Sequence, residues 1–349
     1  MTTSQSTVNR SRRAAATVLY EDRPELTGLK LAALSLRSTA PGLPIVVMAP
    51  SAPPGFQSWA EKHAIEIAPV PEAMASHGWN VKPTVLLHML AHYADVVTWF
   101  DTDIIATSSL ETLLSTYPVE TLVATEEYAW GHSQGSEKRT TALGLPVGRH
   151  IARSVNTGVL RVSESHRSLL LEWERILGTD EYVRAQILPA NRRPLTFLGD
   201  QEVLCGLLGA QQFASVPLAQ LTRGVDIAQC FGPSGFTVRE RWTTRGVLPP
   251  LVHAMGRKPW SRPTYSGSTL NRFGSWWQNM HLDLTPYTAA AQPYLDELGE
   301  PARWARPVTM TGRILSRNPS SIMREMPLTV LDTSQRAFRR AASIRQISA

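Results

Sequence analysis

The chain has 349 residues, of which 43% are hydrophobic and 18% charged, a balance typical of globular proteins with a sizeable core. Its two cysteines, Cys205 and Cys230, exclude a disulfide framework and predict buried, inert thiols. We find no leader-like segment and no run of about 18 apolar residues, so we expect a cytoplasmic protein without a membrane span.

The net charge of +6 is concentrated at one end. Residues 301–349 hold nine arginines against Glu325 and Asp332, a net charge of +7, so the other 300 residues sum to −1. Such a segment suggests an anionic partner, either nucleic acid or acidic lipid; a solvated, poorly ordered end is the alternative. RNA binding normally brings aromatic platforms, and this segment offers only Trp304 and Phe338. We expect no nucleic-acid partner and keep peripheral contact with the inner face of an anionic membrane as a hypothesis.

Strand and helix patterns alternate over the first 100 residues, which predicts an α/β fold with an open, mostly parallel sheet. The strand VVTWF is apolar throughout, as expected for a strand covered on both faces by helices. Ligands on such sheets bind beyond the carboxyl ends of the strands, and Asp101 follows VVTWF. The expected elements are a disordered segment at 1–15, strands at 16–20, 43–50, 64–69 and 96–100, and helices at 29–40, 56–63 and 82–93.

Later elements are less regular. The chain is loop-rich and tryptophan-rich through Trp277, and helical patterning returns after Thr288. We place a soft boundary near residue 290, between a main domain at 16–290 and a basic C-terminal extension at 291–349 that is helical and partly disordered. The remaining elements are predicted as a strand at 156–162, a helix at 163–178 and a helix that starts at Asp200.

The sequence Asp-Thr-Asp follows the apolar strand directly. On an extended chain, Asp101 and Asp103 share one face while Thr102 points away. Two carboxylates at the mouth of a sheet suit a hard divalent cation, Mg²⁺ or Mn²⁺, which takes oxygen ligands and bridges to phosphates. The pair alone is a weak signal, because this spacing arises about once by chance in such a chain; the capping of a loop is the alternative.

A second motif is the segment LVHAMGRKPW at 251–260. It combines a potential metal ligand, His253, with Gly256, which permits close backbone approach. It also holds a phosphate-pairing cation, Lys258, and a tryptophan, Trp260, that follows a proline. Each residue alone has an ordinary structural explanation, but as a group they indicate a functional site.

Together the two motifs resemble those of the retaining glycosyltransferases of family eight, which include glycogenin and the bacterial lipopolysaccharide galactosyltransferases. The resemblance covers residues 17–280 in element order and includes NTG at 156–158 and DQ at 200–201. Its most specific part is His-x-x-Gly-x-x-Lys-Pro-Trp, which here has one residue fewer between Gly256 and Lys258. The resemblance implies a GT-A type, Rossmann-like single domain with a mixed, mostly parallel sheet.

The resemblance also implies a cation site. Asp101, Asp103 and His253 would hold Mn²⁺ (or Mg²⁺), which in turn holds the diphosphate of a nucleotide-sugar donor. Departure of the nucleotide places negative charge on the β-phosphate, so cations aimed there stabilise the transition state more than the ground state.

Further diphosphate contacts follow from the same resemblance. Lys82 and Lys258 would neutralise the diphosphate, and the backbone at Gly256 would lie against it. From the residues alone, Lys82 is also explained as a solvated charge before a helix that Pro83 initiates.

The resemblance places Asp200, Gln201 and Asn156 beside the donor sugar. The structural alternatives are a helix N-cap for Asp200 and a turn or strand end for Asn-Thr-Gly. The implied outcome is retention of the anomeric configuration. Asp200 could act as a nucleophile, or the acceptor hydroxyl could attack from the front face while the departing phosphate takes its proton; we favour the second route.

The nucleotide end is implied less directly. The segment VLYEDRPELTG falls on the family's base- and ribose-binding strip, which makes Leu19, Tyr20 and Asp22 candidates. Glu25 replaces the tyrosine that often stacks on uracil in the family, and a carboxylate supplies no stacking surface. The uridine assignment therefore depends on the family.

The resulting expectation is a Mn²⁺-dependent hexosyltransferase that uses a UDP-sugar donor and a hydroxyl acceptor, either a saccharide, a lipid-linked molecule or a small molecule. A non-catalytic nucleotide-sugar-binding protein of the same fold is one alternative. A nucleotidyltransferase is another, although such enzymes normally carry a glycine-rich, basic loop after the first strand, and EDRPELTG is not one. An inverting transferase would need a carboxylate base near the acceptor, which the sequence neither identifies nor excludes.

Overall fold

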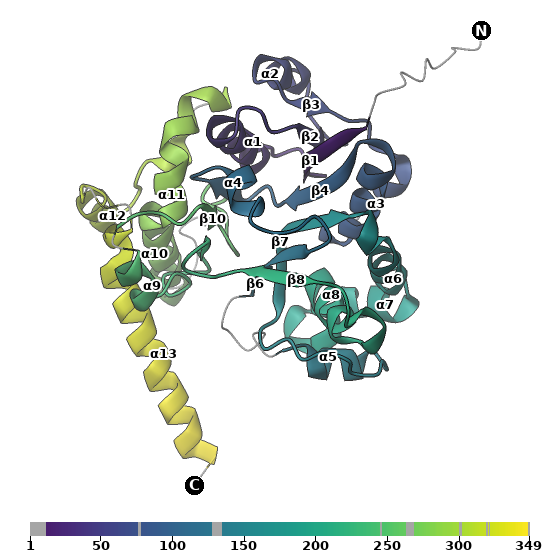
Figure 1. The fold of residues 1–349 in the computed structure, drawn as a ribbon. Helices are drawn as coiled ribbons and strands as arrows, with labels where there is room; N and C mark the ends of the chain where they lie inside the picture. The colour runs from purple at the N-terminus through teal and green to yellow at the C-terminus, as the bar shows by residue number, and fades with distance from the viewer. Residues whose placement is uncertain are drawn as a thin grey trace.

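The computed structural model describes residues 12–75, 78–127, 135–244, 246–262, 269–299, 302–318, 320 and 322–347. Its centre is a seven-stranded sheet made of β1 (Arg13–Tyr20), β2 (Ile45–Met48), β3 (Glu66–Ile67), β4 (Ala94–Phe100), β6 (Leu122–Glu126), β7 (Val155–Ser163) and β8 (Leu218–Leu221). The strand order is β3-β2-β1-β4-β7-β6-β8 (Figure 1). All neighbours pair in parallel except β7, which runs antiparallel to both β4 and β6. The predicted mixed, mostly parallel sheet is confirmed.

Helices cover both faces of this sheet because its central strands are apolar on both sides. On one face, Val97 and Leu160 pack with α3 (Lys82–His92), α6 (Arg167–Leu177) and α8 (Asp200–Gly209). On the other face, Phe100 and Val159 pack with α1 (Thr27–Thr39) and α2 (Phe56–Lys62). The remaining helices around the sheet are α4 (Leu110–Leu114), α5 (Ser136–Ala142) and α7 (Asp180–Ile187).

A small second sheet joins the acidic turn to the later part of the chain. It consists of β5 (Ile104–Ala106), β9 (Ile227–Gln229) and a central β10 (Leu251–His253). β10 pairs antiparallel with β5, which sets His253 opposite Ile104, and parallel with β9. The next hydrogen bond along the pair, from Ala254 N–H to the Asp103 carbonyl, is 2.9 Å long. This pairing brings His253 beside Asp103.

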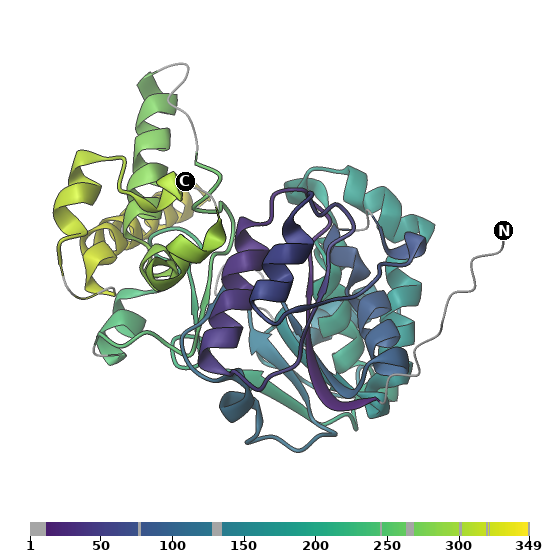
Figure 2. The same ribbon diagram turned by 90° about the horizontal axis from the view of Figure 1, so that it is seen from above.

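The C-terminal helices form a lobe beside α1 (Figure 2). Leu34 of α1 packs with Val252 of β10 and with Tyr287, Leu298 and Ile322 of the lobe. Residues on both sides of position 290 thus share one apolar cluster, and the domain boundary predicted there stays a prediction. The helices of the lobe are α9 (Val238–Thr243), α10 (Thr269–Leu284), α11 (Pro286–Ala291), α12 (Met310–Leu315) and α13 (Met326–Ile347), and the far half of α13 extends away from the body (Figure 1).

A buried ion pair fixes the start of α13. Arg241 Nη2 lies 2.6 Å from Glu325 Oε2, and both side chains are almost completely buried. Arg241 also donates to the carbonyls of Phe236, at 2.9 Å, and Ile322, at 2.6 Å. Loss of one partner would leave a buried charge, so breaking this pair would destabilise the attachment of α13 to the rest of the chain.

Several sequence predictions require correction. β1 begins at Arg13, inside the segment predicted to be disordered, because Arg13 pairs with Ala94 and its side chain bonds to Glu66 at 2.6 Å. α10 occupies part of the region predicted to be loop-rich. Residues 1–11 lie outside the described residues.

Short 3-10 helices lie at Glu72–Met74, Gly78–Val81, Glu164–His166, Ala190–Arg192, Leu195–Phe197, Gln211–Phe213, Gln292–Leu298, Arg303–Ala305 and Met323–Glu325.

Two other predictions concern cysteine chemistry and membranes. Cys205 and Cys230 are both free and buried, as predicted. Within the part of the chain that the structure describes, no helix has both the length and the apolar character needed to cross a membrane.

Candidate active site

The acidic residues lie on a turn at the carboxyl end of β4. Ile104 N–H donates to the Asp101 carbonyl at 3.1 Å, so the expected extended chain is wrong here and a turn brings the two carboxylates together. Asp101 N–H donates to the Gly158 carbonyl at 2.7 Å, which ties the turn to β7. Thr102 points away, as predicted, because its hydroxyl donates to Glu21 Oε2 at 3.0 Å.

Asp101, Asp103 and His253 form a potential cation site. One ligand atom from each residue lies within 4.8 Å of the others. His253 Nε2 is 3.2 Å from Asp103 Oδ1, whereas the buried His253 Nδ1 has no hydrogen-bond partner among the described residues. Carboxylate and imidazole ligands suit Mn²⁺, so the residues present fit the expected metal.

Gly158 makes room for this imidazole. A Cβ atom at position 158 would lie 3.0 Å from His253 Cε1 and 2.8 Å from Asn156 Oδ1. Any side chain would therefore push either His253 or Asn156 out of place, which explains the glycine of Asn-Thr-Gly in terms of packing.

Lys82 is buried against the acidic turn. Its ammonium donates to Thr157 Oγ1 at 2.9 Å and lies 3.1 Å from Asp101 Oδ1 and 3.7 Å from Asp200 Oδ2. Burial lowers the pKa of Lys82, but the two carboxylates outweigh it, and the net pKa is raised. Lys82 is therefore a permanent buried cation, and the solvated-charge explanation is wrong.

Lys258 contacts the other acidic residue. Its ammonium pairs with Asp103 Oδ2 and donates to the Ala254 carbonyl at 2.8 Å. The missing residue after Gly256 therefore does not turn Lys258 away from the site. Burial raises the pKa of Asp103, but Lys258 and His253 together hold that pKa well below its usual range.

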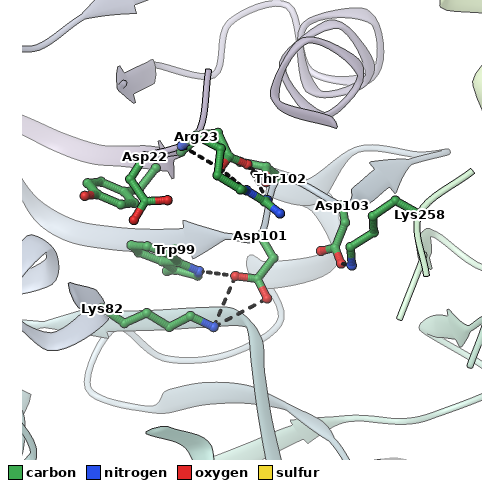
Figure 3. Close-up of a pocket in the computed structure, with 10 residues that line it drawn as sticks. Asp22, Arg23, Lys82, Trp99, Asp101, Thr102, Asp103 and Lys258 are labelled. Carbon is green, nitrogen blue, oxygen red and sulfur yellow. Dashed lines mark hydrogen bonds and ion pairs between the residues drawn. The ribbon is translucent and has the colours of Figure 1, made fainter. Parts of the chain in front are cut away.

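Two cavities share residues of the acidic turn, and Figure 3 shows residues that line the first of them. The first, of about 280 Å³, is lined by Tyr20, Glu21, Asp22, Arg23, Lys82, Trp99, Asp101, Thr102, Asp103 and Lys258. The second, of about 360 Å³, is lined by Ala190, Leu198, Gly199, Glu202, Met255 and the predicted residues Asn156, Asp200, Gln201, His253 and Gly256, together with Thr157 and the shared Lys82, Asp101 and Asp103. The shared residues place the potential cation site between the two cavities.

The predicted nucleotide residues lie around the first cavity, with one exception. Leu19 is fully buried in the core beneath α1 and is not among the lining residues. Tyr20 donates its hydroxyl to the Met74 carbonyl at 2.6 Å and stacks on Trp99, and burial raises its pKa to about 12. Glu25 accepts a hydrogen bond from Thr27 N–H at 2.8 Å, so its carboxylate caps the start of α1.

The predicted sugar-side residues gather beside the second cavity. Asp200 is the first residue of α8, and the N-cap position belongs to Gly199. The Asp200 carboxylate instead accepts a hydrogen bond from Thr157 Oγ1 at 2.9 Å. Burial raises the pKa of Asp200, an effect that Lys82 opposes. The polar network therefore joins Asp200 to Lys82 and so to the acidic turn.

Sequence reasoning missed several polar partners of the site. Trp99 Nε1 donates to Asp101 Oδ1 at 2.6 Å, a contact that the separation of two positions at the end of a strand could have revealed. Thr157 bridges Lys82 and Asp200 from within the Asn-Thr-Gly motif. Glu127 follows β6, so an acidic residue again comes directly after a largely buried strand, as at Asp101.

Arg23 is also beside the first cavity. Its Nε and Nη2 atoms each donate to the buried carboxylate of Glu21 at 2.7 Å. The same carboxylate accepts the Thr102 hydroxyl, so one buried acid links an exposed guanidinium to the middle of the acidic turn. No periodic pattern in the sequence marks this arrangement.

Neither a protein-family model nor a curated protein sequence matches this chain. Solved structures do match. The bifunctional glycosyltransferase WbbM, in its apo form, is 12% identical, with a TM-score of 0.51 over 80% of this chain and 51% of that one. The apo form of the glycosyltransferase GlyE of Streptococcus pneumoniae is 15% identical, with a TM-score of 0.48 over 82% of this chain and 64% of that one.

The galactosyltransferase LgtC, in complex with donor and acceptor sugar analogs, is 17% identical, with a TM-score of 0.45 over 80% of this chain and 95% of that one. This chain thus spans about half of the WbbM chain and less than two thirds of the GlyE chain. The likeness to WbbM shows that the chain has a GT-A type glycosyltransferase fold, as the sequence predicted.

Proposed function

We propose that this protein is a retaining, Mn²⁺-dependent glycosyltransferase that moves a hexose from a UDP-hexose donor to a hydroxyl acceptor. The observation that carries the proposal is the cluster of Asp101, Asp103 and His253 at the junction of two cavities. Two lysines contact the same carboxylates, an arrangement suited to a diphosphate held between a nucleoside and a sugar.

In this proposal, Asp101, Asp103 and His253 would hold Mn²⁺, which when bound supplies positive charge to the diphosphate oxygens. Lys258 pairs with Asp103 and would turn its ammonium toward the diphosphate. Lys82 stays protonated beside Asp101, and its positive charge would stabilise the negative charge that develops on the departing diphosphate. The nucleoside would occupy the cavity beside Tyr20, and the sugar the cavity beside Asp200.

For the chemical step, we favour front-face attack. The acceptor oxygen forms a bond to the anomeric carbon, the bond from that carbon to the β-phosphate oxygen breaks, and the acceptor proton passes to the departing phosphate. The products are a glycoside of retained configuration and UDP. In this route Asp200 keeps its hydrogen bond from Thr157 and its contact with Lys82 and forms no covalent bond to the sugar.

The alternatives are a non-catalytic nucleotide-sugar-binding protein of this fold and a nucleotidyltransferase. The first predicts that one or more of the cation-ligating residues have been replaced, and all three potential ligands are present. The second predicts a basic, glycine-rich loop after β1, where this chain instead has a Glu21–Arg23 pair and a helix capped by Glu25.

A panel of nucleotide sugars tests the activity. We expect release of UDP from at least one UDP-hexose in the presence of Mn²⁺, and loss of that release with EDTA. Release would be measured by a coupled assay for the free nucleotide. Binding of UDP-hexoses without release or transfer would support the non-catalytic alternative, whereas release of pyrophosphate from UTP and a sugar phosphate would support the nucleotidyltransferase.

We also propose that the C-terminal segment contacts an anionic membrane. α13 carries the exposed apolar side chains of Val330, Leu331 and Phe338, and its sequence includes four arginines (Arg336, Arg339, Arg340 and Arg345). Exposed apolar groups among basic residues suit an acidic lipid surface.

Vesicle flotation tests this contact. Replacement of Arg339, Arg340 and Arg345 by glutamine should reduce binding to vesicles that contain phosphatidylglycerol by about 100-fold, because each basic residue near such a surface contributes about 1 kcal/mol. The substitution spares the apolar cluster that a truncation near residue 290 would break. Glutamine at Arg167 and Arg175, two exposed arginines of α6, serves as the control. Equal flotation of both variants would contradict the proposal.

A further inference from the structure

Glu127 is a buried carboxylate next to the candidate active site. It follows the last residue of β6, and its N–H donates to the Ser154 carbonyl at 2.9 Å. Only 7% of the residue is exposed. Its Oε2 atom accepts two hydrogen bonds, from Gln201 Nε2 at 2.6 Å and from Asn156 Nδ2 at 3.1 Å.

The chemistry of these groups determines how the two amides are turned. An ionised carboxylate accepts hydrogen bonds and donates none, so both amides must present their NH₂ groups to Glu127. The rest of the network agrees with this orientation. Gln201 Oε1 accepts from Asn156 Nδ2 at 3.2 Å, and Asn156 Oδ1 accepts from the Gly158 N–H at 2.9 Å.

Glu127 holds two amides that line the second cavity. Asn156 and Gln201 both line the second cavity, together with Asp101 and His253, whereas Glu127 is not among its lining residues. Within the part of the chain that the structure describes, Glu127 therefore reaches that cavity through the two amides that it holds. A charged hydrogen bond of 2.6 Å is of the strong class, so the Gln201 side chain loses its freedom to exchange nitrogen and oxygen positions.

We propose that Glu127 is a positioning residue that fixes the donor and acceptor polarity of Gln201 and Asn156 toward the hexose of the donor. The inference rests on the proposed glycosyltransferase function. Hexose epimers differ in the direction of a single hydroxyl group, so an amide of fixed polarity discriminates between them more strongly than one that can flip. Glu127 thereby contributes to the choice of sugar without touching it.

The substitution Glu127→Gln tests the proposal because it keeps the size of the side chain and replaces one acceptor oxygen with a donor. We expect kcat/KM for UDP release from the preferred hexose donor to fall at least about 10-fold, and the ratio between UDP-glucose and UDP-galactose to move toward one. Calorimetric binding of UDP with Mn²⁺ should change less than about 2-fold, because UDP has no hexose to meet the amides.

A second variant separates orientation from folding. Glu127→Gln combined with Gln201→Glu restores a charged hydrogen bond between the two positions with its polarity reversed. We expect it to recover the thermal midpoint of the wild type but not its kcat/KM. Recovery of kcat/KM as well would overturn the proposal, because the direction of the amide would then be irrelevant.

Glu126→Gln is the matched control. Glu126 precedes Glu127, its carboxylate accepts hydrogen bonds from Arg153 Nη1 at 2.7 Å and from Arg223 N–H at 3.2 Å, and it is not among the residues that line the second cavity. Its substitution should leave kcat/KM and the donor ratio unchanged. Suppose that the wild type is active. If Glu127→Gln then keeps the wild-type kcat/KM and donor ratio, or if it loses UDP binding in parallel with kcat/KM, this inference alone is overturned. A wild type that releases UDP from no UDP-hexose of the panel would overturn the proposed function and this inference with it.

Discussion

Replacement of Asp103 by alanine should lower Mn²⁺-dependent UDP release by about 10³-fold in kcat/KM. The substitution removes one of the three potential cation ligands. It also removes the carboxylate that pairs with Lys258 and faces His253 at 3.2 Å, which leaves a lysine beside the position that the cation would occupy. Both effects weaken binding of a divalent cation, and both act on the charge that develops on the leaving diphosphate. Initial rates over a Mn²⁺ titration would measure the change.

Asp95→Ala is the control for this prediction. Asp95 lies on the same strand, β4, at its opposite end, and its carboxylate meets Arg12 on the surface at 2.9 Å. Its substitution should leave the rate unchanged. EDTA-treated wild type and Asp103→Ala should show similar residual rates. An Asp103→Ala variant that keeps both its rate and its response to Mn²⁺ would show that the acidic turn does not hold the metal.

Replacement of Lys82 by methionine should impair both folding and activity. The buried ammonium lies between Asp101 and Asp200, at 3.1 and 3.7 Å. Methionine is close in size but carries no charge, so two carboxylates would face each other without a cation. We expect the free energy of unfolding to fall by about 3–5 kcal/mol and kcat to fall by about 10²–10³-fold. Urea denaturation of the metal-free protein and single-turnover rates would measure the two effects.

A double substitution distinguishes the two roles of Lys82. Lys82→Met with Asp200→Asn removes the cation together with one of its carboxylates, so the surplus negative charge disappears. We expect most of the lost stability to return while kcat stays low, because the positive charge near the leaving group is still missing. Lys82→Met with wild-type kcat would mean that this lysine is a structural counter-ion only.

Much of the site was predictable because its signals are local. An apolar run of five residues followed at once by Asp-Thr-Asp places two carboxylates at a strand end, and the structure has them there. The group of His253, Gly256 and Lys258 was recognisable as a motif, and the structure brings His253 and Lys258 to Asp103. These predictions needed only the composition of short segments and the rule that parallel sheets bind ligands beyond the carboxyl ends of their strands.

The nucleotide end was less predictable. Leu19 belongs to a segment that reads as a strand, but alternation alone did not tell which of its side chains enter the core and which line a cavity. Arg23 gave no signal at all, because its position depends on Glu21, a buried acid whose burial comes from packing against residues far along the chain. Ion pairs of this kind depend on surroundings that no short window of sequence contains.

The sequence by itself determined the α/β class and the position of two carboxylates at the end of β4, since both depend on residue type and short-range spacing. The tertiary structure alone decided that β7 runs antiparallel to β4. The mouth of the sheet therefore receives the start of β7, which holds Asn156 and Thr157, and not its end. It also decided the pairing of β10 with β5, which sets His253 beside Asp103, although the two residues are 150 positions apart in the sequence. Strand direction and partner depend on which pairings bury the most apolar surface in the whole chain, and that comparison is not contained in any single segment.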